Sequence, residues 1–414
     1  MYIPDDLPQV IKDADEKAIR SLQHTFEAVD EIRDRNIIKV LNAFRKNGIA
    51  ARHMQGSTGY GYGDEGRDRL DMLMADIMGT GSALCREQIM SGTHALTVAL
   101  FGILRPGDTL LAATGRPYDT LLEVIGVEGS ASGSLMKFGV LYDECPFAGE
   151  DPDYDMIAEK AAKASVVHVQ KSRGYSQRRS LSNADVEKIA EIVHKSNPQA
   201  VVFVDNCYCE FTETTEPGQV GADLIVGSLI KNAGGGIAET GGYIAGRTDL
   251  VEKCADRLTA PGTGGEIGCW PVGHRNTFLG LFSAPATVSE AVKASYYASE
   301  LFSELGFDTS PAPGESHSDI VTAVNLYSAE NLIAFCRGIQ AYSPVDSAAE
   351  PTPWAMPGYA DEVIMAAGTF TGGASIELSC DGPLRPPYTA YIQGALNFTS
   401  ARYAMLETAA KIIK

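Results

Sequence analysis

Short apolar runs and helical repeats alternate along the middle of the chain, between about residues 83 and 259. The apolar runs that predict strands are ALCREQIM, DTLLAA, FGVLYD, SVVHVQ, AVVFVDN, DLIVGS and GGYIAG. The segments with apolar residues at helical spacing are THALTVALFGIL, PYDTLLEVIG, DYDMIAEKAAK, SNADVEKIAEIVHK and TDLVEKCADRL. This alternation is typical of a doubly wound, mostly parallel sheet, so the predicted fold class is α/β.

Different patterns flank this region. A long amphipathic helix is expected from about Asp15 to Asn47, and a helix from Gly66 to Met78 leads into the sheet. Beyond it, we expect a long helix from about Ala286 to Leu305, strands near TAVNLY, EVIMAAG and SIELS, and helices over ENLIAFCRGIQ and YTAYIQGALNFTSARYAMLETAAKI. The predicted organisation is a helical arm (1–55), a large α/β domain (56–285) and a smaller C-terminal α+β domain (286–414).

Composition narrows the function classes. The 414 residues carry a net charge of -19, which argues against binding to nucleic acid or to an anionic membrane surface. The eight cysteines have no metal-ligand spacing; Cys207 and Cys209 lie two apart in a probable strand, without further ligands nearby, so we expect no metal. The N-terminus lacks the pattern of a signal peptide, no apolar run is long enough to span a bilayer, and we expect a cytoplasmic protein.

Two residues at predicted strand ends suggest a cofactor. Asp205 ends the strand VVFVD, and Lys231 follows the apolar strand LIVGS by three residues, next to a glycine run. A lysine in an apolar setting can become an imine-forming amine. Pyridoxal 5'-phosphate (PLP) enzymes need such a lysine together with a carboxylate that faces the pyridine nitrogen. Asp205 and Lys231 are therefore candidates for that pair, at the sheet edge where α/β proteins bind ligands.

A possible phosphate cradle lies earlier in the chain. Ser91, Gly92 and Thr93 end one strand and open a helix, where free N–H groups and the helix dipole attract anions. Ser228 adds a hydroxyl three residues before the lysine. Tyr118, at the next helix start, could stack on a flat ring. The alternatives are a plain helix cap for the first group and a tyrosine that packs on its own helix for the second.

The loop GSTGYGYGDEGRDRL contains a formal GxGxxG match at Gly61–Gly66. We reject a dinucleotide site there because no hydrophobic strand precedes it. Tyr60 and Tyr62 favour a flexible binding or subunit-contact loop, and a plain surface loop is the alternative.

These features occur together in one order: a Ser-Gly turn, an aromatic residue after the following strand, a strand that ends in VDN, and Ser-x-x-Lys. The set resembles the fold-type-I PLP enzymes of cysteine and methionine metabolism (aspartate aminotransferase-like fold), the cystathionine lyase and methionine γ-lyase group. QKSRGYS, GSLIKNAGGGIAETGGYIAG and GGASIELSCDGPLRPPY resemble the divergent branch labelled aluminium-resistance proteins.

The resemblance implies a role for each matching residue. Lys231 would bind the cofactor covalently and move protons, and Asp205 would hold the pyridine nitrogen protonated. Tyr118 would stack on the ring and assist protonation of the leaving group. The implied phosphate ligands are Ser91, Gly92, Thr93 and Ser228, and the implied substrate contacts are Tyr60 or Tyr62 from a neighbouring subunit, Arg173 near the ring oxygen, and Arg385 on the substrate carboxylate. Ile230 departs from the family pattern, because a hydroxyl residue usually precedes the lysine.

The resulting hypothesis is a homodimeric or homotetrameric PLP-dependent carbon–sulfur lyase, with active sites at subunit interfaces. It would remove the α-proton of a cystathionine, cysteine or methionine type of substrate and eliminate a β or γ substituent, with Lys231 as a base whose pKa is lowered by burial and by the cationic cofactor. Transamination or racemisation on the same residues is one alternative. A nucleotide-binding oxidoreductase or a ligand-binding protein without turnover is another.

Overall fold

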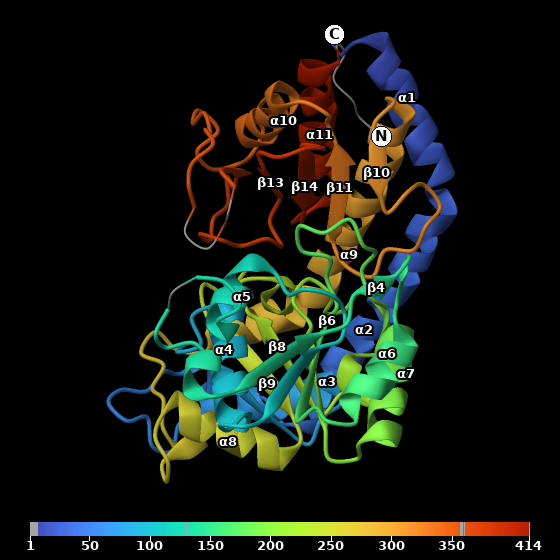
Figure 1. Cartoon of the computed structure of the whole chain (residues 1–414). Helices are drawn as coiled ribbons and strands as arrows, with labels where there is room; N and C mark the ends of the chain where they lie inside the picture. The colour runs from blue at the N-terminus through green and yellow to red at the C-terminus, as the bar shows by residue number, and fades with distance from the viewer. Residues whose placement is uncertain (1–6, 130, 357–358, 360, 414) are drawn as a thin grey trace.

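The computed structural model describes residues 7–129, 131–356, 359 and 361–413. Figure 1 shows two bodies, one built around a central sheet with helices and one around a smaller sheet near the C-terminus. The long helices α2 (Gln23–Lys46) and α9 (Arg275–Glu304) pack on each other and run along both bodies.

The central sheet has seven strands in the order β1-β9-β8-β7-β6-β2-β3. Their bounds are β1 Ser82–Arg86, β2 Thr109–Ala112, β3 Leu141–Glu144, β6 Val166–Gln170, β7 Val201–Asp205, β8 Leu224–Ser228 and β9 Gly242–Gly246. The strands from β8 through β3 are parallel, and β9 pairs antiparallel with both β8 and β1. Each predicted strand of this domain is present. The prediction of a doubly wound, mostly parallel sheet is confirmed.

Helices cover both faces of this sheet, because its inner strands are buried on both sides and need an apolar core on each face. One core joins the sheet to α4 (Gly92–Ile103), α5 (Asp119–Ile125) and α8 (Thr248–Leu258). A second core joins it to α6 (Tyr154–Ala161) and α7 (Asn183–Ser196), and a third to α3 (Glu65–Met78) and α9. The short elements are β4 Phe147–Ala148, β5 Asp151–Pro152, η1 Ala51–Met54, η2 Met136–Phe138, η3 Pro217–Gln219, η4 Asn232–Gly234 and η5 Gly264–Glu266.

The N-terminal arm differs from the prediction. Instead of one helix it contains α1 (Gln9–Ser21) and α2, separated at Leu22. The apolar face of α1 packs into the core of the C-terminal body through Ile11, Ala14 and Ala18, whereas α2 contributes Val29 and Val40 to a core of the large body. The two segments thus bury apolar faces against different bodies, which periodicity within one segment does not reveal.

The C-terminal body holds an antiparallel sheet in the order β10-β11-β14-β13-β12, packed against α10 (Ala329–Ala341) and α11 (Phe398–Ile412). The strands are β10 Asp308–Ser310, β11 Val321–Asn325, β12 Val363–Ala366, β13 Ser379–Pro383 and β14 Thr389–Gln393. Three predictions are wrong here: β10 was not expected, the strand placed over SIELS begins only at Ser379, and β14 replaces the start of the predicted last helix.

The misassigned strand β14 has a physical explanation. Thr389, Tyr391 and Gln393 alternate with Ala390 and Ile392, which is a strand pattern, and every one of the five is buried. The apolar residues of α11 follow so closely that the two patterns read as one helix. The predicted boundary between residues 285 and 286 falls inside α9, which begins at Arg275 and continues through Pro285; the division into domains stays a prediction.

Candidate active site

The central residues of the site lie at the carboxyl edge of the large sheet. β7 and β8 are parallel neighbours, with Asp205 opposite Val226, so Asp205 ends its strand beside the segment that leads to Lys231. Asp205 is only 3% exposed, and its Oδ1 accepts a hydrogen bond from the Cys207 amide at 3.1 Å. The Cys207 side chain donates a second hydrogen bond to this carboxyl group.

Lys231 lies in the turn after β8, with its Nζ 4.0 Å from the centre of the Tyr208 ring. The Tyr208 backbone has a φ of 73°, a left-handed conformation that costs energy for a residue with a bulky side chain. Packing around the site holds this conformation, which carries the ring beneath the amine. Lys231 is partly accessible to solvent, so its amine can meet a ligand that enters from outside.

The pKa of Lys231 depends on the groups that face its amine. Burial lowers it, but the facing groups of Cys207, Tyr208, Asp205 and Tyr118 raise it by more, so the pKa lies well above the ordinary lysine value. The predicted lowering of this pKa includes the charge of the bound cofactor, so it stays a prediction for the holoenzyme. Burial likewise raises the pKa of Asp205, while the charge of Lys231 lowers it. The protein thus holds an ammonium and a carboxyl group side by side.

The N-terminus of α4 forms a cradle beside this pair. Gly92 is buried, and a Cβ added to it would lie 2.9 Å from Cys207 Sγ and 3.9 Å from both Lys231 Nζ and Ser228 Cβ. The missing side chain leaves the backbone amides open toward the lysine. Ser91 caps the helix, since its Oγ accepts from the His94 amide at 3.1 Å. His94 is a local cap as well, since its Nδ1 accepts from the Met90 amide at 3.2 Å.

Tyr118 reaches the same cradle from the start of α5. Its hydroxyl lies 3.0 Å from Thr93 Oγ1, and its amide donates to Gln170 Oε1 at 3.2 Å. Burial raises the pKa of the Tyr118 phenol, and the charge of Asp205 raises it further. Tyr118 therefore keeps its proton at neutral pH and can donate it.

The structure places the remaining predicted residues elsewhere. Tyr60 and Tyr62 are 69% and 67% exposed, and their rings stack 5.6 Å apart. Their loop leaves the large body at the edge opposite the small body, where the Gly268 amide donates to the Tyr60 carbonyl at 2.9 Å (Figure 1). Within one chain, these two tyrosines do not approach the lysine.

The two predicted arginines have different surroundings. Arg173 is 1% exposed; its Nη1 donates to the Ser310 carbonyl at 2.7 Å, and its Nε and Nη2 have no hydrogen-bond partner among the described residues. Arg385 is exposed and pairs with Asp361 at 3.0 Å. It lies in the turn between β13 and β14, whereas the sequence suggested a loop after the last strand. Their substrate contacts stay predictions.

Several residues around Lys231 were missed by sequence reasoning. Cys207 was assigned to a strand with Cys209, but β7 ends at Asp205, and Cys207 lies in the turn that packs on Gly92. Tyr208 lies under the amine, Asp381 is close enough to feel its charge, and Tyr175 packs beside Asp381 and Tyr208. Tyr208 and Cys207 follow Asp205 directly, which was a usable signal, whereas Asp381 comes from the distant C-terminal sheet and no local pattern marks it.

The residues at this edge fit PLP. Lys231 could bind its aldehyde, the Asp205 carboxyl group could face its pyridine nitrogen, and the amides at Gly92 could hold its phosphate. Neither a group of three metal-ligating side chains nor a helix long and apolar enough to cross a membrane occurs among residues 7–129, 131–356, 359 and 361–413.

A lysine and a buried carboxyl group at neighbouring strand ends of this sheet, with a phosphate cradle opposite, define a PLP-dependent enzyme of fold type I. More narrowly, the methionine gamma-lyase family model matches residues 11–413, and the chain belongs to that family.

Similar proteins agree with this assignment. A crystal structure from Clostridium novyi NT, described as a carbon-sulfur lyase involved in aluminum resistance, is 44% identical and covers 98% of this chain and 97% of its own, with a TM-score of 0.94. A structure from Clostridium acetobutylicum, for which a cystathionine beta-lyase activity involved in aluminum resistance is proposed, is 42% identical over 98% and 96% of the chains, with a TM-score of 0.95. The uncharacterized protein YnbB of Bacillus subtilis (strain 168) is 45% identical over 91% of this chain and 90% of its own. The PLP-dependent protein YhfS of Escherichia coli, at 14% identity and a TM-score of 0.62 over 92% and 96% of the chains, shares the fold.

Proposed function

We propose that the chain is a PLP-dependent carbon–sulfur lyase that acts on a sulfur-containing amino acid of the cystathionine, cysteine or methionine type. The observation that carries the proposal is the amine of Lys231, which stands over the Tyr208 ring beside the buried Asp205 without an ion pair in the described part of the chain. Membership of a lyase family supports the same reaction class.

The residues can divide the reaction between them. PLP, when bound, supplies an electron sink that stabilises negative charge at the substrate Cα. Lys231 Nζ would take the proton from Cα, and Asp205 would hold the ring nitrogen of the bound cofactor protonated. The bond to sulfur then breaks, the electron pair leaves with sulfur, and the protonated Tyr118 hydroxyl is the candidate donor to it. The Thr93 hydroxyl, 3.0 Å away, orients this phenol.

Subunit assembly is part of the proposal. Tyr60 and Tyr62 form an exposed stacked pair on an extended loop, and exposed aromatic residues are favoured at protein interfaces. We propose that a homodimer or homotetramer places this loop over the site of a neighbouring subunit. A cytoplasmic location also belongs to the proposal, since all eight cysteines are free thiols.

The decisive experiment is spectral. The purified protein should show the visible absorbance of lysine-bound PLP, and borohydride reduction should bleach it and leave the label on Lys231. Lys231→Ala should lack the band and all lyase activity. Lys160→Ala, which removes a partly exposed lysine paired with Asp143, is the matched control and should keep both.

Product analysis separates the proposal from its rival within PLP chemistry. Cystathionine, cysteine and methionine should be tested for release of a keto acid without any added keto acid acceptor. Transamination requires such an acceptor, and elimination does not. A normal band on Lys231 with no keto acid from any of the three would sink the sulfur-substrate claim and leave the cofactor assignment intact.

A further inference from the structure

We propose that Asp381, with the tyrosine rings around it, forms a subsite that binds an ammonium group carried by the side chain of the substrate. This inference rests on the proposed lyase function and names the substrate class more narrowly: sulfur amino acids with a second amino group beyond the sulfur.

The strand register places the Asp381 carboxyl on one face of the small sheet. Asp381 of β13 pairs with Tyr391 of β14, which in turn pairs with Ala323 of β11. Side chains alternate along strands, so these three share a face. The alternate residues, such as Cys380 and Ile392, point into the core against α10 and α11. Asp381 therefore faces away from the helices of its own body.

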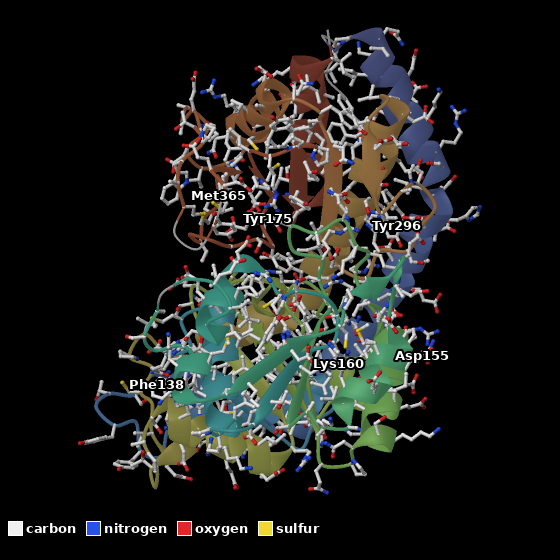
Figure 2. The ribbon with its side chains drawn as sticks, viewed as in Figure 1. Phe138, Asp155, Lys160, Tyr175, Tyr296 and Met365 are labelled. Atoms are coloured by element: carbon white, nitrogen blue, oxygen red, sulfur yellow. The ribbon has the colours of Figure 1, made fainter. Side chains whose placement is uncertain are left out.

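The large body supplies the opposite wall. The Tyr175 hydroxyl approaches the Asp381 carboxyl, and its ring centre lies 5.0 Å from that of Tyr391 and 5.7 Å from that of Tyr359. Figure 2 shows Tyr175 at the junction of the two bodies. Tyr175 and Tyr208 pack on the same cluster of small-sheet residues, and Tyr208 carries the Lys231 amine over its ring. Asp381 and Lys231 thus face the same space.

The Asp381 carboxyl forms no ion pair with any residue that the structure describes. Asp381 is 9% exposed; Oδ2 accepts from Gln393 Nε2 at 3.4 Å, and the shielded Oδ1 makes no hydrogen bond of ordinary geometry. Burial raises its pKa to about 7, although the Tyr175 hydroxyl and the charge of Lys231 lower it. A buried carboxyl group is either held neutral or paired with a cation, so a cation that binds beside Asp381 would keep it ionised.

The surrounding rings select the kind of cation. Tyrosine faces attract ammonium groups within about 6 Å of the ring centre. Three tyrosines pack together beside Asp381: Tyr175, Tyr208 and Tyr391. A carboxylate oxygen can accept a hydrogen bond from the same ammonium. Thioether amino acids with a second amino group bring such a cation, whereas cysteine and methionine do not. The α-amino group is a poorer candidate, because it must meet the cofactor at Lys231.

A matched pair of substrates tests the subsite. S-(2-aminoethyl)-L-cysteine ends in an ammonium where S-propyl-L-cysteine ends in a methyl group, at equal length. We expect the wild-type holoenzyme to prefer the aminoethyl compound in kcat/KM by about 10- to 100-fold, the range for a hydrogen bond to a charged group. Asp381→Asn should remove the preference by lowering kcat/KM for the aminoethyl compound alone. For the propyl compound, kcat/KM should stay within about threefold of wild type. Asp308→Asn, an exposed aspartate on β10 of the same sheet, should keep the preference.

Binding provides a readout that does not depend on turnover. Borohydride-reduced holoenzyme should be titrated calorimetrically with both compounds, and Asp381→Asn should lose the difference in Kd. Tyr175→Phe, which keeps the ring and removes the hydroxyl, should lose part of it and serves if the first variant does not fold. Equal affinities in wild type, or an undiminished difference in Asp381→Asn and Tyr175→Phe, would overturn the subsite. A different outcome would reject the lyase function and leave the subsite standing. In that outcome neither compound yields keto acid, while the Kd values differ in wild type and the difference is lost in Asp381→Asn.

Discussion

Replacement of Gly92 by alanine tests the packing that shapes the cofactor cradle. The added methyl would lie 2.9 Å from Cys207 Sγ, closer than side chains normally approach, and 3.9 Å from Lys231 Nζ, which is ordinary contact. Overpacking of this kind costs about 1–3 kcal/mol. Gly92 is also the first residue of α4 and has no left-handed backbone, and there Gly→Ala should stabilise by about 0.4–1 kcal/mol. The net expectation for Gly92→Ala is a loss of roughly 0–2.6 kcal/mol.

Removal of Cys207 Sγ should change the effect of Gly92→Ala from destabilising to stabilising. In Cys207→Ala the clash partner is absent, so adding Gly92→Ala should now stabilise by about 0.4–1 kcal/mol. The four proteins form a double-mutant cycle, measured by urea denaturation of the cofactor-free protein. PLP affinity should fall on adding Gly92→Ala in both backgrounds, because the methyl still projects toward Lys231. The reasoning is refuted if Gly92→Ala has the same effect on stability with and without Cys207.

Further predictions concern the buried acids and the subunit loop. Burial raises the pKa of Glu210 to about 8, and its Oε1 accepts from the Tyr243 hydroxyl at 2.9 Å. The pKa of a glutamate in the unfolded chain is about 4.3. The contribution of protonated Glu210 to stability is therefore complete below that pH and is lost as the pH rises to about 8. Glu210→Gln should therefore flatten the decline in denaturation midpoint between pH 5 and 8, and an unchanged decline would contradict this assignment. If Tyr60 and Tyr62 serve a neighbouring site, a Tyr60→Phe/Tyr62→Phe variant should lose activity; co-expressed with Lys231→Ala it should recover part of it, whereas no recovery would place the loop outside the active site.

The large domain could be predicted from the sequence because each of its buried strands is a short apolar run between helical repeats. The same logic located Asp205 and Lys231, since strand ends in a parallel sheet meet at one edge. It failed for β14, where buried threonine, tyrosine and glutamine residues hid a strand behind the apolar repeat of α11. That failure also hid β14, the strand that pairs with Asp381.

The charge of Lys231 shows most clearly what a sequence pattern omits. The sequence suggested an amine whose pKa is lowered by burial and by the cationic cofactor. In the chain without cofactor, the turn after Asp205 brings Cys207 and Tyr208 against the amine, and the net effect is a raised pKa. Tyr208 reaches this position only through a left-handed backbone, which no residue preference predicts. A protonated amine is a poor nucleophile and a poor base. The cationic cofactor would lower this pKa, so we expect the protein to set the position of Lys231 and the bound cofactor to set its reactivity.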